Sequence, residues 1–215
     1  MNASAIDLLE SRSCWIFDLD GTLTQPVHDF AFIRSELSIP DDADILGHLD
    51  TLLPEEAALR HSRLFDIEYN LACQAVPAPG ALDLLALLES LGIRMGILTR
   101  NSREIALQTL ETIRARCYFV DSHVLGRDEV SPKPDPAGIF HLLEQWQADA
   151  DCVVMVGDYL FDLQAGRAAG AITVHVGRPD CQRWPEFSDI MVDSLVELHK
   201  AYELKGSNHG KRVSG

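Results

Sequence analysis

The sequence predicts an α/β protein: a Rossmann-like parallel sheet with helices on both faces and a small all-helical cap inserted after the first strand. Short apolar runs without polar alternation recur along the chain, as expected for strands buried on both faces. Helical patterns separate most of these runs, which favours parallel strands joined by crossover helices. The alternation is interrupted once, after the first run, and this interruption predicts the cap.

Five apolar runs are expected to form strands, at residues 14–17, 93–98, 117–120, 152–156 and 172–176. Helices are expected at residues 81–91, 102–115, 136–147, 159–169 and 194–203. Glycine at a helix end, a capping side chain before the first turn and proline at the first helical position set these boundaries. The signals are Gly92 and Gly170 at C-termini, and Asn101-Ser102, Asp135-Pro136 and Asp193 at N-termini.

Between Gly21 and Pro79 the apolar residues recur with helical spacing, and no run resembles a strand. The segment Pro77-Ala78-Pro79-Gly80 closes the stretch with a rigid, non-helical hinge. We therefore expect a core of residues 1–23 and 79–205, and a helical cap of residues 24–78. The polar, Gly- and Ser-containing end at 206–215 is expected to be a flexible tail.

Composition narrows the possible partners. The 215 residues carry a formal net charge of -15, which disfavours nucleic-acid binding because a phosphate backbone attracts a basic surface. A phosphate site in so acidic a chain must be locally positive. The five cysteines lack metal-type spacing, and no run is long enough to cross a membrane, so we expect a cytoplasmic protein with reduced thiols.

The first chemical motif is Asp18-Leu19-Asp20-Gly21-Thr22-Leu23, which directly follows the first expected strand. Ligands of parallel sheets bind beyond the carboxyl ends of the strands, and alternation projects Asp18 and Asp20 to the same side. Two adjacent carboxylates can divide the roles of nucleophile and proton donor. Taken alone in so acidic a chain, the pair is better explained as a capped turn at a strand end.

Two further motifs supply groups that bind anions. Thr99-Arg100-Asn101 ends a strand ahead of a helix, where a hydroxyl and free backbone N–H groups form an anion cradle, although a simple helix cap has the same pattern. Lys133 lies among the prolines of Ser131-Pro132-Lys133-Pro134-Asp135-Pro136. Because prolines restrict the backbone, the direction of the ammonium group is fixed, which favours a functional lysine.

The fourth motif, Gly157-Asp158-Tyr159-Leu160-Phe161-Asp162, again follows a strand and opens a helix. An aspartate near a helix N-terminus has an electrostatic explanation of its own in the helix dipole. If Asp158 and Asp162 converge with Asp18 and Asp20, however, four acids share one pocket and need a cation. Ligands that are all oxygen select a hard cation, so Mg²⁺ is expected before Zn²⁺.

Together, the four motifs in this order resemble the haloacid dehalogenase superfamily of phosphohydrolases. The helical insertion after the first motif resembles the subclass with a small cap, which includes phosphoglycolate phosphatases and β-phosphoglucomutases. The segment Thr24-Gln25-Pro26-Val27 departs from many members, which have Asp-Ser soon after the Thr-Leu pair. The resemblance covers the chain to about residue 200.

The resemblance implies a role for each motif. Asp18 would attack the phosphorus of a monoester and become phospho-aspartate, while Asp20 protonates the leaving alcohol and then activates water. Thr99, with Arg100 and Asn101, would hold the phosphoryl oxygens, and Lys133 would neutralise the charge on that group and on Asp18. Mg²⁺ would be bound by Asp18, Asp158 and the backbone carbonyl of Asp20, and Asp162 would support Lys133 or the water shell of the metal.

The function expected from this resemblance is hydrolysis of a small phosphorylated metabolite by a monomer or homodimer. One alternative is a phosphomutase, which passes the same phosphoryl group to a sugar. Another is a catalytically silent binding protein, although every motif position is filled. Several basic side chains could face the substrate, but an exposed helix face is the more common place for such residues; they are His28, Arg34, His61, Arg63 and Arg100.

Overall fold

The apolar runs form one six-stranded parallel sheet in a computed structural model, which describes residues 7–9, 11–27, 29–177 and 181–209. The strand order is β3-β2-β1-β4-β5-β6. From the central β1, the chain builds outward first through β2 and β3, and then through β4, β5 and β6 on the other side. The strands are β1 (Cys14–Phe17), β2 (Arg94–Leu98), β3 (Val124–Leu125), β4 (Val153–Gly157), β5 (Ile172–Val176) and β6 (Ile190–Val192).

The register brings the ends of the three central strands to one level. Phe17, the last residue of β1, is paired with Ile97 in β2 and with Val156 in β4. The residues that follow these strands therefore emerge at the same edge of the sheet. This edge lies at the point where the strand order reverses, which is where open α/β sheets bind ligands.

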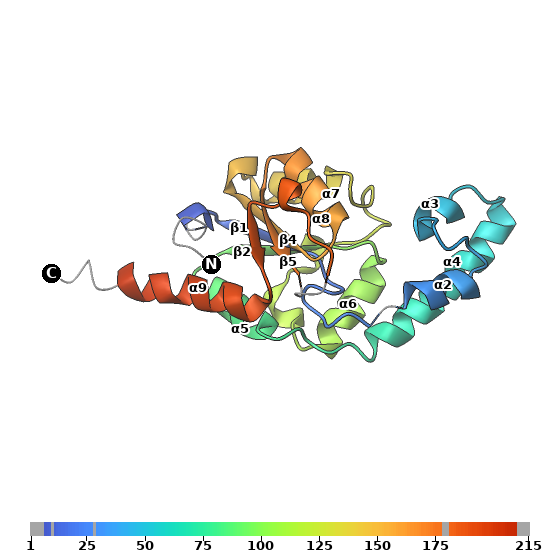
Figure 1. Cartoon of the computed structure of the whole chain (residues 1–215), viewed down its shortest axis with the longest axis horizontal. Coiled ribbons are helices and arrows are strands. Elements are labelled where there is room, and N and C mark those ends of the chain that lie inside the picture. Colours follow the sequence, from blue (N-terminus) through green and yellow to red (C-terminus); the bar gives the residue numbers. More distant parts are fainter. Residues whose placement is uncertain (1–6, 10, 28, 178–180, 210–215) are drawn as a thin grey trace.

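Helices cover both faces of the sheet (Figure 1). Trp15 and Phe17 pack in the core beneath α5 (Ala81–Ser90), α6 (Arg103–Thr112) and α9 (Leu195–His209). Cys14 and Ile16 point to the opposite core, beneath α7 (Ala137–Trp146) and α8 (Leu160–Ala169). Because both faces are covered, β1 is apolar at every position, and the α/β class predicted from such runs is confirmed. Among the described residues, no helix is both long and apolar enough to cross a membrane.

The prediction of a strand at residues 117–120 is wrong. A 3₁₀ turn spans Arg116–Tyr118, and the edge strand is instead the two-residue β3, which follows a second turn at Asp121–His123. Val120 is 60% exposed, so this apolar run does not enter the sheet. Strand β6 was not expected either. Both β3 and β6 are short edge strands, too short for a sequence pattern to reveal.

Most helix ends follow the signals in the sequence, with two corrections at α9. The Ser102 hydroxyl accepts a hydrogen bond from the Ile105 N–H at the start of α6, and Gly170 ends α8 with φ 78°. At the start of α9, the capping acceptor is Ser194 and not Asp193. Helix α9 continues to His209, beyond the expected end at residue 203. Of the expected tail, residues 210–215 lie outside the described residues.

Three helices between β1 and α5 form a separate lobe, seen at one end of the molecule in Figure 1. These are α2 (Phe30–Glu36), α3 (Ile45–Leu49) and α4 (Pro54–Ala72). The lobe has an apolar cluster of its own, which includes Ile33, Leu49 and Leu64. Within its described residues, which exclude 28, the lobe contains no strand, as the helical spacing indicated.

The two connections between lobe and core run side by side. The N–H of Gln25 donates to the carbonyl of Val76, and the N–H of Ala78 donates to the carbonyl of Leu23, each at 2.8 Å. An antiparallel bridge joins Thr24 and Pro77 between them. This pairing closes the base of the lobe, and it supports the division that we propose, with the cap at residues 24–78.

A buried ion pair also joins the cap to the core. Two nitrogens of Arg127, just after β3, donate to the two carboxylate oxygens of Glu68 in α4, at 2.9 and 2.8 Å. The side chains are only 11% and 8% exposed. Burial raises the pKa of Glu68 above its usual value, although the hydrogen bonds and charge of Arg127 act in the opposite direction. Because both side chains are nearly buried, loss of either one would leave the other charge without its partner.

We expect Glu68→Met or Arg127→Met alone to lower the free energy of unfolding by about 3–5 kcal/mol, because each leaves a buried charge without its partner. The double substitution should cost much less than the sum, since it removes both charges. Urea denaturation of the four proteins measures this coupling. The exposed pair Arg63–Glu36 is the control, and its loss should cost about 1 kcal/mol or less. Additive effects at Glu68 and Arg127 would contradict the expectation.

Candidate active site

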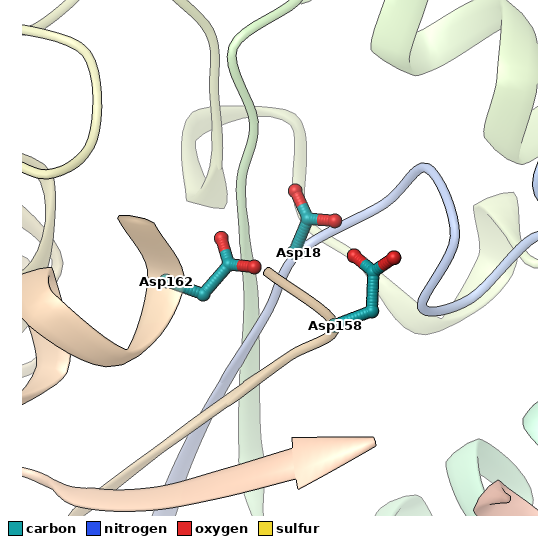
Figure 2. Close-up of side chains that lie close together, drawn as sticks. All are labelled: Asp18, Asp158 and Asp162. Atoms are coloured by element: carbon teal, nitrogen blue, oxygen red, sulfur yellow. The ribbon is translucent and has the colours of Figure 1, made fainter. Parts of the chain in front are cut away.

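Three aspartates converge at the carboxyl ends of β1 and β4 (Figure 2). Asp18 directly follows β1, Asp158 directly follows β4, and Asp162 lies in the first turn of α8. Each offers a carboxylate oxygen, and these oxygens lie within 4.8 Å of one another. Asp18 and Asp162 are buried and Asp158 is partly buried. The parallel register thus brings Asp18 next to two acids that lie 140 and 144 residues further along the chain.

Lys133 lies between two of these acids and is itself 2% exposed. Its Nζ is 2.5 Å from Oδ1 of Asp18 and 2.6 Å from Oδ1 of Asp162. Burial disfavours the ammonium form, but the charges and hydrogen bonds of the two carboxylates outweigh burial and raise the pKa of Lys133 above its usual value. The lysine is therefore a fixed positive charge next to Asp18, as its proline frame indicated.

The acids nevertheless outnumber this single cation. Burial, with the charges of Asp18 and Asp162, raises the pKa of Asp158 to about 8. Burial also raises the pKa of Asp162 to about 6, even though Lys133 lowers it. A carboxyl group that keeps its proton at neutral pH marks a place where positive charge is insufficient. The three aspartates supply only oxygen ligands, so the donor set fits a hard divalent cation.

Asp20 lies on the cap side of this cluster. Its Oδ2 accepts a hydrogen bond of 2.7 Å from the side-chain amide of Asn101. Burial raises the pKa of Asp20 to about 7, and the negative charges of Asp18 and Glu68 add to the effect. Asp20 is thus distinct from the three convergent acids in its hydrogen bonding and its position. A carboxyl group with this pKa can both donate and accept a proton near neutral pH.

The loop after β2 runs past the same acids. Thr99 is 3% exposed, and its hydroxyl accepts a hydrogen bond of 3.2 Å from the N–H of Asn101. The carbonyl of Asn101 accepts from the N–H of Arg127, and the carbonyl of Arg100 accepts from the guanidinium of the same residue. Arg127 therefore holds the loop in place through two of its carbonyls, while its guanidinium also pairs with Glu68 in the cap.

The basic residues considered as substrate contacts lie in different places. The Arg100 guanidinium contacts Asp44 in the cap at 2.8 Å. Arg34 lines the cavity described below, whereas Arg63 is on the exposed face of α4 and pairs with Glu36. His61 is partly exposed and does not line that cavity. His28 lies outside the described residues.

A cavity of about 430 Å³ separates the cap from the core. The acids and Lys133 form its inner end, together with Thr99 and Asn101. Residues of all three cap helices form its outer wall. The cavity is therefore a compartment for a small molecule, with the charged cluster at one end.

Several residues of the site were not expected from the sequence. Arg127 was missed because the strand before it was placed at residues 117–120, which hid the fact that Gly126-Arg127 follows a strand end. Glu68 was missed because nothing in the helical pattern of α4 distinguishes it from the other acids there. Thr22 was quoted in the first motif without a role; its hydroxyl lies 3.4 Å from a carboxylate oxygen of Asp18 and of Asp158 and can donate to either. Position at a strand end is the signal that could have identified Arg127.

Comparison with known proteins agrees with this geometry. The haloacid dehalogenase-like hydrolase family matches residues 43–176, which include Thr99, Lys133, Asp158 and Asp162. The chain belongs to this family. A haloacid dehalogenase-like hydrolase domain-containing protein of Arabidopsis thaliana is 30% identical, over 87% of this chain and 82% of that protein. A phosphoglycolate phosphatase of Rhodospirillum rubrum is 33% identical, over 74% of this chain and 77% of that protein.

Solved structures of the haloacid dehalogenase-like group share the fold. CbbY from Rhodobacter sphaeroides, solved in complex with phosphate, has a TM-score of 0.67 at 22% identity, covering 87% of this chain and 96% of that one. A predicted phosphoglycolate phosphatase from Haemophilus somnus has a TM-score of 0.67 at 19% identity, covering 89% and 98%. The predicted membership among haloacid dehalogenase-like hydrolases that resemble phosphoglycolate phosphatases is confirmed.

Gly21 is the residue at which backbone and site are most tightly coupled. Its φ is +87°, and a Cβ there would lie 2.4 Å from Oδ2 of Asp158. We expect Gly21→Ala to lower the free energy of unfolding by about 1–2 kcal/mol through backbone strain, and to displace Asp158. The displacement should reduce phosphatase activity by a much larger factor than the strain alone would cause.

Gly92→Ala is the matched control, because Gly92 has φ +68° and open space around its missing Cβ. Urea denaturation should show a similar loss of stability in both variants, while activity at a temperature where both are folded should fall only in Gly21→Ala. Equal activities in the two variants would show that Asp158 tolerates the displacement.

Proposed function

We propose that this chain is a Mg²⁺-dependent phosphomonoesterase that forms a phospho-aspartate on Asp18. The observation that carries the proposal is the position of Asp18, with Lys133 at 2.5 Å and two further carboxylates close by. A carboxylate that attacks an anionic phosphate must be surrounded by positive charge, because phosphoryl transfer is catalysed mainly by positioning and charge neutralisation. The names of the relatives support phosphate esters as the substrate class.

In the proposed reaction, one oxygen of Asp18 attacks phosphorus, and the bond from phosphorus to the leaving alcohol breaks. The proton for the alcohol comes from Asp20, whose raised pKa suits a general acid near neutral pH. The ionised Asp20 then removes a proton from water, which attacks the phosphorus and releases Asp18 and phosphate. Asn101, which donates to Asp20, keeps that carboxyl group in position through both steps.

Asp18 and Asp158 would hold the cation, with the backbone carbonyl of Asp20, and Asp162 would support Lys133 from the other side. When bound, the cation supplies positive charge that favours the approach of phosphate to a carboxylate. Thr99 and the backbone of residues 100–101 would hold the phosphoryl oxygens. The Arg100 side chain is less suited to this task than the sequence indicated, because Asp44 binds it.

A phosphomutase remains the second candidate, because the same phospho-aspartate can pass its phosphoryl group to a sugar. Isomerised sugar phosphate in a product assay would favour it. A silent binding protein is the third, and turnover of any phosphate ester would exclude it. A cytoplasmic location and a monomeric or homodimeric state remain predictions.

Asp18→Asn should reduce hydrolysis of p-nitrophenyl phosphate by about a thousandfold or more, because it removes the attacking oxygen's charge. Asp20→Asn should cost about 10²- to 10⁴-fold, the usual range for a general acid and base. The loss should be larger for an alkyl phosphate, whose leaving alcohol needs the proton more. Acid quenching and mass spectrometry should locate phosphate on Asp18 in the Asp20→Asn protein. Activity retained without the Asp18 carboxylate would rule out the nucleophile assignment.

Mg²⁺ should raise the melting temperature of the unmodified protein, since a ligand at about 100 times its Kd adds about 2.7 kcal/mol to the free energy of unfolding. Asp158→Asn should abolish this shift by removing a ligand. Asp66→Asn, an exposed position on α4, removes the same charge away from the site and should leave the shift in place. A shift of equal size in all three proteins would place the ion elsewhere.

A further inference from the structure

Beyond its acidic inner end, the cavity is lined by apolar side chains and by equal numbers of acids and arginines. Residues from α2, α3, α4 and α8 contribute hydrophobic side chains to it. They are Phe30, Ile33, Ile45, Leu46, Leu64 and Phe161. The part of a substrate that extends from the phosphate toward the cap would therefore have these apolar side chains to contact.

Each arginine of this outer region already donates a hydrogen bond to an acceptor within the protein. Among the described residues that line the cavity, the cations other than Lys133 are Arg34, Arg100 and Arg127. Arg127 donates through two nitrogens to Glu68, and Arg34 donates through Nε to the carbonyl of Ala43 at 3.1 Å. Of the two ion-paired arginines, Arg100 is more exposed than Arg127, so its partner has the larger effect on a bound substrate.

Arg100 is held between a carboxylate and an aromatic ring. Its Nη2 lies 2.8 Å from each oxygen of Asp44, and its Cζ lies 4.8 Å above the centre of the Phe161 ring. Burial alone would raise the pKa of Asp44, but the hydrogen bonds from Arg100 and Gly47 and the charges of Arg100 and Arg34 lower it below its usual value. The Asp44 carboxylate thus stays ionised and competes with any anionic substrate group for Arg100.

The formal charges in the outer region also balance. Its acids are Asp42, Asp44 and Glu68, and its bases are the three arginines. A carboxylate or second phosphate on the leaving group that contacts Arg100 would compete with Asp44 for the guanidinium and would lie beside the Asp44 carboxylate. Such an arrangement is unfavourable, because like charges repel and an existing ion pair is weakened.

Building on the function proposed above, we infer that the preferred substrate is a phosphomonoester whose leaving group is uncharged and largely apolar, and that Asp44 sets this preference by holding Arg100. This substrate class differs from the compound after which the phosphoglycolate phosphatases are named, because phosphoglycolate carries a carboxylate. Asp44 is a specificity-determining residue in this proposal, and it acts on the substrate through Arg100.

The test compares 2-phosphoglycolate with its uncharged amide, 2-phosphoglycolamide, which has nearly the same size. In the unmodified protein, kcat/KM should favour the amide by about tenfold, the effect of one charged hydrogen-bonded contact. Asp44→Asn should move the ratio about tenfold toward phosphoglycolate, because the Arg100 charge is released. Asparagine still accepts the hydrogen bond from the Gly47 N–H at the start of α3, so the helix cap is kept.

Two further variants separate this effect from a general change in charge. Asp42→Asn removes the same formal charge from the same wall, but Arg100 pairs with Asp44 and not with Asp42, so the ratio should change much less. The double variant Asp44→Asn/Arg100→Gln removes both charges of the pair, so the ratio should return to about that of the unmodified protein. A double variant that keeps the ratio of Asp44→Asn would show that release of the Arg100 charge does not cause the change, and would overturn the inference.

The result for p-nitrophenyl phosphate distinguishes the two levels of the proposal. Hydrolysis of that ester together with a preference for phosphoglycolate over its amide overturns the inference and leaves the proposed phosphatase intact. Hydrolysis of none of the three esters contradicts the proposed function itself. Melting temperatures check that the variants are folded, and if Asp44→Asn does not fold, the ratio for the unmodified protein still decides the question.

Discussion

The contact of Lys133 with Asp18 and Asp162 is the interaction on which the rest of the site depends. It places a permanent positive charge in a cluster of acids that would otherwise repel one another. One lysine cannot balance the negative charge of all these acids, and the raised pKa of Asp158 reflects the shortage of positive charge. The cluster is therefore built to receive further positive charge, and an attacking carboxylate requires the same charge when phosphate approaches.

A second set of charges joins the cap to this cluster. Glu68 in α4 pairs with Arg127, Arg127 holds the loop that carries Asn101, and Asn101 donates to Asp20. The position of the cap and the orientation of the proposed proton donor are thus linked by consecutive hydrogen bonds. Asp44 and Arg100 form another contact between cap and core at the cavity wall. The arginines at this junction bind acids of the cap, which leaves the outer cavity electrically balanced.

The prediction from sequence was most successful where residues act locally. Apolar runs and turn residues placed the central strands and most helices to within a few residues, because burial on both faces and helix capping are local constraints. It failed at the sheet edges. The apolar run at residues 117–120 looks like a strand, yet the edge strand is β3 at Val124–Leu125. Pairing with β2 decides that choice, and pairing is not encoded in a short run.

For the candidate site, the sequence by itself determined which groups are present: two acids after the first strand, a lysine framed by prolines and two acids at the start of a later helix. It also determined that the acids lie after strands, because both of their motifs adjoin an apolar run. Only the tertiary structure decided their partners. Arg100 was expected near phosphate, and it lies against Asp44. Distances between residues far apart in the chain depend on strand order, register and the position of the cap, which no local pattern specifies.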